Sequence, residues 1–328
     1  MIVKCSNKNC YISGILLTEN NISDEHIIPN SLGGHLKSPD LVCTEINNNL
    51  FAKLDVLLSK SIELAQLIAF KRDRNEQPTI LGISTDGLKY LVNNELKGKL
   101  MPIKPFKVID EFGEEYIKLP ASQKEEYIES VLKKNSSLKR EDLKYKEFYE
   151  DVYKDIHFPD GVTIFKTKDA FRGIAKIATN FAILNDITKN YFEGFIEFIK
   201  GGNDLSRIQL GYFYPKNLLK YEFEEKEISH IIYLKGCEKE KILYCYIELF
   251  NTHCFIVNLS YKYEGLDFEK SYIWNLFTAT ELKKSISLNL TFEYLSKRQY
   301  LWYPEVEDDY KERLKRTNSI CNLKLKIP

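Results

Sequence analysis

Several features that would assign a class of protein at once are missing from this chain. No apolar stretch approaches the length of about 18 residues that a membrane-spanning helix needs, and the N-terminus MIVKCSNKNC lacks the profile of a signal peptide. The seven cysteines form no dense framework, which agrees with reduced thiols rather than a disulfide scaffold. We therefore expect a cytoplasmic protein with no membrane partner.

The chain also lacks an excess of charge of either sign, because 47 basic residues balance 47 acidic ones. A protein that binds nucleic acid places lysine and arginine opposite phosphates, so a neutral total requires local segregation of charge. Basic clusters at residues 71–74 and 311–316 are candidates for such contacts, and a solvated face is the alternative for each. We find no internal repeat, no low-complexity tract, no Walker loop and no dinucleotide fingerprint.

The length of 328 residues exceeds one typical domain. Local patterns predict an α+β protein with three parts: an N-terminal segment at residues 1–76, called the finger below, a connector of short strands and helices at 77–168, and a larger C-terminal domain at 169–328. In the last part we expect a helix beginning near Asp169 and then an antiparallel sheet, with a tight hairpin at Asn251 and Thr252.

The residues that suggest chemistry lie near the N-terminus. Glu25 and His26 open the segment EHIIPNSLGG, in which an apolar pair is followed by a glycine turn. From Asn47 onward leucines recur at helical spacing, and Asp55 lies about two turns along that helix. Two carboxylates, an imidazole and a carboxamide can therefore converge.

This set of side chains suits hydrolysis of a phosphodiester bond. A hard divalent cation such as Mg²⁺ or Mn²⁺ takes one or two carboxylate ligands, retains water, and stabilises charge on the phosphate and the leaving oxygen. A histidine near its unperturbed pKa can accept the proton of the attacking water.

Over roughly residues 1 to 65 the chain resembles the HNH endonuclease family, on the strength of EHIIP, SLGG and the asparagines that follow Cys43. The resemblance implies a ββα-metal finger in which His26 is the general base. Glu25 and Asp55 would be ligands of the catalytic cation, and Asn47 would brace the histidine loop. Asn48 is the alternative to Asn47 as the bracing asparagine. Asn48 is also a candidate oxygen ligand of the catalytic cation.

Family members usually carry two cysteine pairs that bind a structural zinc ion. Here Cys5, Cys10 and Cys43 remain, whereas Ile46 stands where the fourth cysteine is expected. Structural zinc is almost always four-coordinate, so the set is incomplete unless His35 completes it. A zinc site and a group of small buried side chains therefore both stay open as interpretations of these cysteines.

Further along, RGIAKIATNFAILN resembles a stretch found downstream of the finger in the same branch of the family. Arg172, Lys176 and Asn180 are spaced to share one face of a helix. We expect that face to be solvated, with contact to a phosphate as the alternative.

The sequence thus predicts a metal-dependent endonuclease acting on DNA, in a defence or mobile-element setting suggested by the family alone. A single finger offers one active site, so cutting both strands needs a homodimer or successive nicking. Two alternatives stay open. The finger could bind nucleic acid without catalysis, or the C-terminal domain could hold the nuclease inactive until a ligand or partner protein binds.

Overall fold

The computed structural model describes residues 1–62, 80–84, 88–92, 98–101, 104–109, 113–120, 123–145, 156–157, 168–204, 206, 208–215, 217–297 and 304–320. The chain divides into two compact units, one made of Met1–Pro78 with Val162–Pro328 and the other of Thr79–Gly161. The finger and the C-terminal region, which we expected as separate parts, therefore belong to one unit.

The finger begins with irregular chain and a short antiparallel pair of strands, and it ends in helix. Its elements are β1 (Glu25–His26), η1 (Asn30–Leu32), β2 (Lys37–Ser38), α1 (Thr44–Ile46), η2 (Asn47–Phe51) and α2 (Ala52–Lys60). The segment η2 is one turn of π-helix between α1 and α2. Such turns are rare in helices and are frequent at functional sites.

The C-terminal part of the same unit contains an antiparallel sheet in which six of the described strands run in the order β15-β14-β11-β12-β13-β9. Their bounds are β9 (Gln209–Tyr212), β11 (Ser229–Cys237), β12 (Ile242–Leu249), β13 (His253–Ser260), β14 (Phe268–Asn275) and β15 (Thr280–Glu281). The strands β10 (Leu219–Lys220) and β16 (Ser287–Leu288) form a separate pair. The helices are α4 (Lys168–Leu184), η6 (Lys189–Tyr191), α5 (Glu193–Ile199), α6 (Phe292–Ser296) and α7 (Pro304–Ile320).

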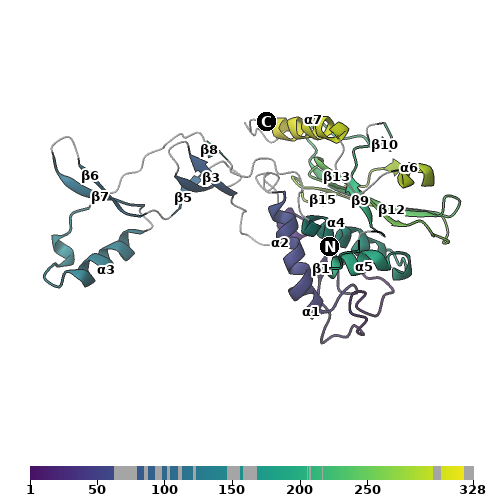
Figure 1. Cartoon of the computed structure of the whole chain (residues 1–328), viewed down its shortest axis with the longest axis horizontal. Coiled ribbons are helices and arrows are strands. Elements are labelled where there is room, and N and C mark those ends of the chain that lie inside the picture. The colour runs from purple at the N-terminus through teal and green to yellow at the C-terminus, as the bar shows by residue number, and fades with distance from the viewer. Residues whose placement is uncertain are drawn as a thin grey trace. The chain divides into compact units, whose positions relative to one another are not determined.

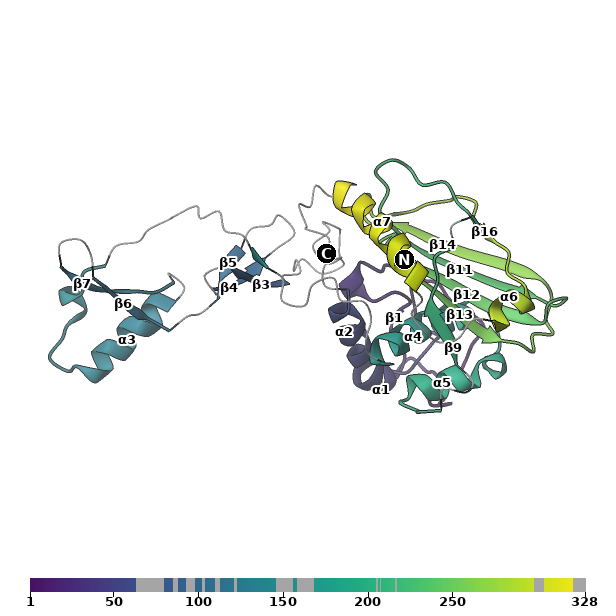
Figure 2. The same cartoon turned by 45° about the horizontal axis from the view of Figure 1, so that its top comes forward.

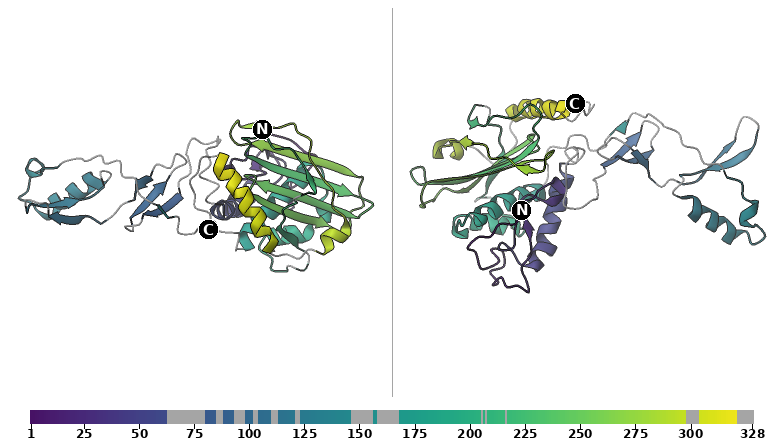
Figure 3. Two further views of the ribbon diagram at one scale, coloured as in Figure 1. Left: turned by 90° about the horizontal axis from the view of Figure 1, so that it is seen from above. Right: turned by 180° about the vertical axis from the view of Figure 1, so that it is seen from behind.

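Helix α4 lies between the finger and the sheet. It packs against α2 on one side and against β9, β11, β12 and β13 on the other, while α7 crosses the opposite face of the sheet (Figures 1 and 2). The view from above in Figure 3 shows α7 lying across the strands. Helix α4 is therefore the layer that joins the finger to the sheet.

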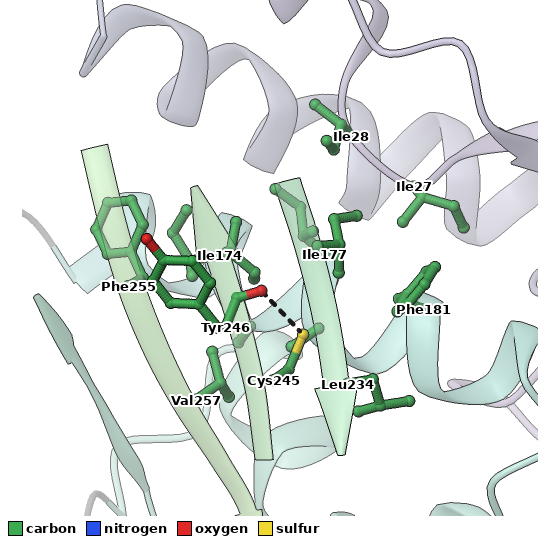
Figure 4. Close-up of a cluster of buried hydrophobic side chains, with 14 of the residues drawn as sticks. Ile27, Ile28, Ile174, Ile177, Phe181, Leu234, Cys245, Tyr246, Phe255 and Val257 are labelled. Carbon is green, nitrogen blue, oxygen red and sulfur yellow. Dashed lines mark hydrogen bonds between the residues drawn. The ribbon is translucent and has the colours of Figure 1, made fainter. Parts of the chain in front are cut away.

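The core of this unit is continuous across that layer. Ile174, Ile177 and Phe181 of α4 are buried in the cluster that includes strand residues of the sheet and the finger residues Ile27 and Ile28 (Figure 4). A helix that is buried on nearly all sides usually has apolar side chains all around its circumference. Polar side chains in the middle of α4 must therefore find partners inside the protein.

The second unit contains a four-stranded sheet in the order β5-β4-β3-β8, a hairpin and helices. Its elements are β3 (Ile80–Ser84), β4 (Lys89–Val92), β5 (Gly98–Leu100), β6 (Phe106–Ile109), β7 (Glu115–Lys118), α3 (Lys124–Lys134), η5 (Arg140–Asp142) and β8 (Ile156–His157). Ile109 and Tyr116 of the β6–β7 hairpin are exposed, so little apolar surface is buried there.

The α+β fold class is confirmed, and so are the helix predicted near Asp169 and the hairpin between β12 and β13. At the hairpin Phe250 and Asn251 both adopt positive φ, 58° and 54°. Positive φ at both central residues is the conformation of a type I′ β-turn, whose twist matches that of the strands it joins.

Among the described residues, no helix is long and apolar enough to cross a membrane.

Of the two basic clusters, the structure describes only the one at residues 311–316. Residues 71–74 lie outside the described residues. In the cluster at 311–316, Arg313 pairs with the buried carboxylate of Glu248 at 2.9 Å, and Arg316 donates to the backbone carbonyls of Glu224 and Glu227. Arg313 thus holds α7 against β12, and Arg316 holds it against the loop before β11. Both side chains make contacts within the protein, so the solvated-face interpretation is wrong for these two arginines.

Candidate functional site

The strand that carries Glu25 and His26 is positioned by the glycine turn that follows it. Gly33 has a φ of 84°, a backbone conformation that residues with a Cβ atom rarely adopt. At Gly34 a Cβ would lie 1.9 Å from the carbonyl oxygen of Ile28, so only glycine fits. The turn returns the chain to β2, which pairs Glu25 with Ser38 and His26 with Lys37.

Neighbouring side chains on a strand point to opposite sides, and the burial of this pair follows that rule. Glu25 is only 2% exposed, whereas His26 is half-buried. The buried residues Ile27 and Ile28 anchor the strand in the core. The carboxylate is thus directed into the protein, while the imidazole stays within reach of solvent.

Inside the protein the carboxylate of Glu25 meets a lysine from α4. The Nζ atom of Lys176 lies 2.6 Å from Oε1 of Glu25 and 2.5 Å from Oδ1 of Asp55 on α2. The side chain of Lys176 is fully buried, and its ammonium lies 5.0 Å from the centre of the Phe51 ring. The two predicted cation ligands are therefore brought together, with an ammonium between them.

This geometry depends on the close approach of α2 and α4. A Cβ on Gly173 would lie 2.9 Å from the Cβ of Leu58, so the absence of a side chain at 173 lets the helices touch. Gly173 lies three residues before Lys176, and Leu58 three residues after Asp55. The helix crossing is thus within one turn of the ion pairs on both helices.

A buried hydrogen-bond network supports the other side of Glu25. Asn180 donates from Nδ2 to Oε1 of Glu25 at 3.1 Å, and its Oδ1 accepts from the hydroxyl of Tyr11 at 2.6 Å. The Tyr11 hydroxyl also lies 3.1 Å from Oγ1 of Thr179. Asn180, Thr179 and Tyr11 are all buried, so the carboxylate is held by fixed partners that cannot exchange freely with water.

Burial and charge shift the titration of these groups. Burial raises the pKa of Glu25 to about 7, against the opposing effect of Lys176, and the Asp55 carboxylate adds to the rise. Burial alone would lower the pKa of Lys176, but the carboxylates of Asp55 and Glu25 hold that pKa above its usual value. The ammonium is accordingly charged at neutral pH.

The solvated face predicted for Arg172, Lys176 and Asn180 is wrong. Lys176 and Asn180 are fully buried, and Arg172 pairs with Asp169 at 2.6 Å and donates to the carbonyl of Gly202. The signal for this was present in the sequence. A lysine is almost never fully buried unless it is paired. A lysine in a helix of small apolar residues therefore predicts that buried carboxylates pair with it.

The asparagines after Cys43 have different surroundings. Asn47 donates from Nδ2 to the hydroxyl of Ser23 at 2.7 Å, which ties the start of the π-turn to the residue two before Glu25. Asn48 is exposed. The contact of Asn47 is of the kind expected for a bracing residue, although its described partner is Ser23 rather than the turn after His26.

The cysteines do not assemble as a zinc site. Cys10 accepts from the backbone N–H of Ser13 at 3.4 Å, and the Ser13 hydroxyl lies 3.9 Å from the sulfur of Cys43. The backbone N–H of Cys5 instead donates to Asp40, and burial raises the pKa of the Cys5 thiol. Within the described part of the chain, no three histidine, cysteine or acidic side chains gather as a metal-holding group. The structure therefore gives no support to a zinc site at Cys5, Cys10 and Cys43, and the interpretation of these cysteines as small buried side chains stays open beside it.

His35, considered as a fourth zinc ligand, stacks on Trp274 of β14 with 4.5 Å between ring centres. A second contact joins the same turn to the sheet, since Nε2 of His230 lies 2.7 Å from the carbonyl oxygen of Leu32. Both contacts hold the finger against β11 and β14.

The site does fit a catalytic divalent cation. Glu25 and Asp55 supply hard oxygen ligands, and Mg²⁺ in proteins commonly uses only one or two carboxylates together with water. Both carboxylates already lie within 2.6 Å of one ammonium, so their oxygens are close enough together to face a single positive charge.

Comparison with known families agrees with the sequence patterns. Residues 10–63 match the model of the HNH endonuclease family, which confirms the predicted resemblance over the segment that contains the glycine turn, Asn47 and Asp55. No match was found among curated proteins or among solved structures. The likeness to HNH endonucleases is therefore confined to residues 10–63 of the 328-residue chain.

Proposed function

We propose that this chain is a divalent-cation-dependent endonuclease that hydrolyses phosphodiester bonds in DNA. The observation that supports the proposal best is the convergence of Glu25 and Asp55. They come from the strand and the helix of the HNH region and meet within 2.6 Å of a single positive charge. Two carboxylates so placed are the ligands that a phosphodiesterase site needs for a hard cation.

Each residue has a defined role in this proposal. His26, half-buried at the end of β1, accepts the proton of the attacking water. Glu25 and Asp55 hold the cation, with Asn48 as a further oxygen ligand, and Asn47 braces the strand through Ser23. The bound Mg²⁺ or Mn²⁺ supplies positive charge to the phosphate and to the leaving oxygen.

DNA is the proposed substrate because of the HNH match over residues 10–63. One finger provides one active site, so we propose that double-strand cleavage requires a homodimer or two successive nicks. The defence or mobile-element setting follows from the family resemblance alone.

The first experiment incubates purified protein with supercoiled plasmid and Mg²⁺ or Mn²⁺. Wild type should give nicked or linear product, whereas His26→Ala and an EDTA control should give none. His35→Ala is the matched control, because that histidine belongs to the same finger but stacks on Trp274, and it should still cleave. A parallel reaction with single-stranded RNA tests the choice of nucleic acid.

One observation favours a second candidate, a finger that binds nucleic acid without cutting it. Lys176 already pairs with both carboxylates, as expected of a site in which an ammonium has taken the place of a cation. Gel-shift and cleavage assays on the same DNA separate the two functions. DNA binding without cleavage at any concentration of Mg²⁺ or Mn²⁺ would support the second. Cleavage that begins only when a ligand or partner protein is added would support gating by the C-terminal region.

A further inference from the structure

The HNH match ends at residue 63, yet the positive charge that pairs with its two carboxylates comes from Lys176, more than one hundred residues later in the chain. Both ion pairs are short and the lysine side chain has no exposed surface. Breaking such a pair is unfavourable, because the partner left behind is a buried charge without a counter-ion. A cation that binds Glu25 and Asp55 must therefore compete with Lys176.

We propose that Lys176 is an exchangeable counter-ion of the site. Its ammonium holds Glu25 and Asp55 together until a divalent cation binds them, and it then pairs with a phosphate oxygen of the incoming DNA. The inference rests on the proposed function and adds a mechanism by which cation and substrate bind together.

The charges of the site support this exchange. With both carboxylates ionised, Glu25, Asp55 and Lys176 sum to one negative charge. Adding a divalent cation alone leaves one uncompensated positive charge in a largely buried site, where unpaired charge is expensive. A phosphodiester carries one negative charge and brings the sum to zero. Cation and DNA should each strengthen the binding of the other, because such coupling is reciprocal.

The surroundings of the ammonium also favour a short displacement rather than a permanent structural role. Lys176 contacts the face of the Phe51 ring, which stabilises a cation without a fixed hydrogen-bond direction. Asp55 is 23% exposed, so the pair has an open side toward solvent. Asn180 keeps its own bond to Glu25, and this bond can hold the carboxylate in place while the ammonium moves.

The test measures Mn²⁺ binding by isothermal titration calorimetry in a His26→Ala background, in which DNA stays intact. With Lys176 present, a short DNA duplex should tighten Mn²⁺ binding by about tenfold or more. Lys176→Met should bind Mn²⁺ more tightly than its parent without DNA, and DNA should then change that affinity only slightly. Weaker or unchanged Mn²⁺ binding in Lys176→Met overturns the proposal, as does a parent protein whose Mn²⁺ affinity does not respond to DNA.

Thermal unfolding provides a second readout. In EDTA, Lys176→Met should unfold at a lower temperature than wild type because two carboxylates lose their counter-ion, and Mn²⁺ should restore most of the loss. Lys235→Met is the matched control, since Lys235 pairs with Glu269 at 2.6 Å in the sheet, and Mn²⁺ should not rescue it. Equal Mn²⁺ responses in the two variants contradict the exchange.

If Lys176→Met does not fold, the wild-type chain still decides the matter. The fully buried Lys176 should resist an amine-reactive label in EDTA, and Mn²⁺ without DNA should raise its labelling as read by mass spectrometry, because the displaced ammonium then has no phosphate to pair with. Constant labelling overturns the proposal.

Failure of the exchange and failure of the nuclease are distinguishable. Plasmid cleavage with no effect of Lys176 on Mn²⁺ affinity removes only the exchange, whereas tighter Mn²⁺ binding by Lys176→Met in a protein that never cleaves removes only the nuclease.

Discussion

Single residues of α4, outside the matched region, complete the candidate site. Lys176 pairs with both Glu25 and Asp55. Asn180 fixes the orientation of the Glu25 carboxylate by a hydrogen bond, and Tyr11 in turn donates to Asn180. A buried hydrogen bond to a charged group contributes about 1.5–3 kcal/mol. The energy that holds the carboxylate therefore comes from helix α4 as well as from the finger.

Asn180→Leu should destabilise the protein by about 2 kcal/mol, because it leaves the Tyr11 hydroxyl and Glu25 each without one buried partner. Tyr11→Phe should cost about 1 kcal/mol, since it removes only a neutral hydroxyl. Urea unfolding of the two single variants and the double variant tests whether they share one network. The double variant should lose less than the sum of the single losses, and strictly additive losses would show that the residues act independently.

At the scale of elements, the contact between α2 and α4 sets the distance between the two carboxylates. At Gly173 the helices touch, because a Cβ there would lie 2.9 Å from the Cβ of Leu58 in the last turn of α2. The strand β1 and the helix α2 belong to the finger, but their side chains meet only because α4 lies against both. The geometry of the site is thus a property of helix packing rather than of the finger alone.

Gly173→Ala tests this packing. In an exposed helix the change would stabilise the fold by about 1 kcal/mol, but here the new methyl group meets Leu58. We expect a loss of about 1–3 kcal/mol from overpacking, together with weaker plasmid cleavage as Asp55 moves away from Lys176. Combining it with Leu58→Ala should restore cleavage by making room for the methyl group. A Gly173→Ala variant with wild-type stability and cleavage would show that the helix contact does not control the site.

At the scale of the whole molecule, the finger is fastened to the sheet by buried polar contacts as well as by a shared core. His230 on β11 accepts from the backbone N–H of Phe250 and so presents Nε2–H to the carbonyl of Leu32. Burial lowers the pKa of His230 to about 4 and that of His253 to about 3. Both side chains are therefore neutral in the folded protein at physiological pH.

The two buried histidines should accordingly lower the stability of the fold in mild acid, while the raised pKa of Glu25 acts in the opposite sense. Below its usual pKa of about 6.5, a histidine takes up a proton in the unfolded chain but not in the folded one, so its contribution to stability falls as the pH drops toward 4. Each of the two histidines should contribute a loss of about 2 kcal/mol between pH 7.5 and pH 5. Urea unfolding at both values should show a smaller acid effect in His230→Gln than in wild type. An equal effect in the two proteins would mean that His230 is not held neutral by the fold.

How far the sequence predicted this molecule depends on the range of the interactions involved. The glycine turn after His26, the helix at Asp169 and the hairpin at Asn251 follow from local patterns, and the structure confirms them. The packing of the finger with the C-terminal region could not be predicted this way, since it depends on contacts between residues far apart in the chain, such as Lys176 with Glu25. The sequence left the zinc site open for the same reason, because spacing does not show whether thiols converge.

The most direct test of the central claim is the plasmid-nicking rate of Asp55→Asn against wild type in Mn²⁺. Asparagine has nearly the same shape and can still accept from Lys176, so the fold should persist while the site loses one anionic cation ligand. The account predicts a fall of about two orders of magnitude or more in the nicking rate, as is typical when a group that stabilises the transition state is lost. An Asp55→Asn variant that nicks plasmid at the wild-type rate would contradict the assignment of Glu25 and Asp55 as the cation site.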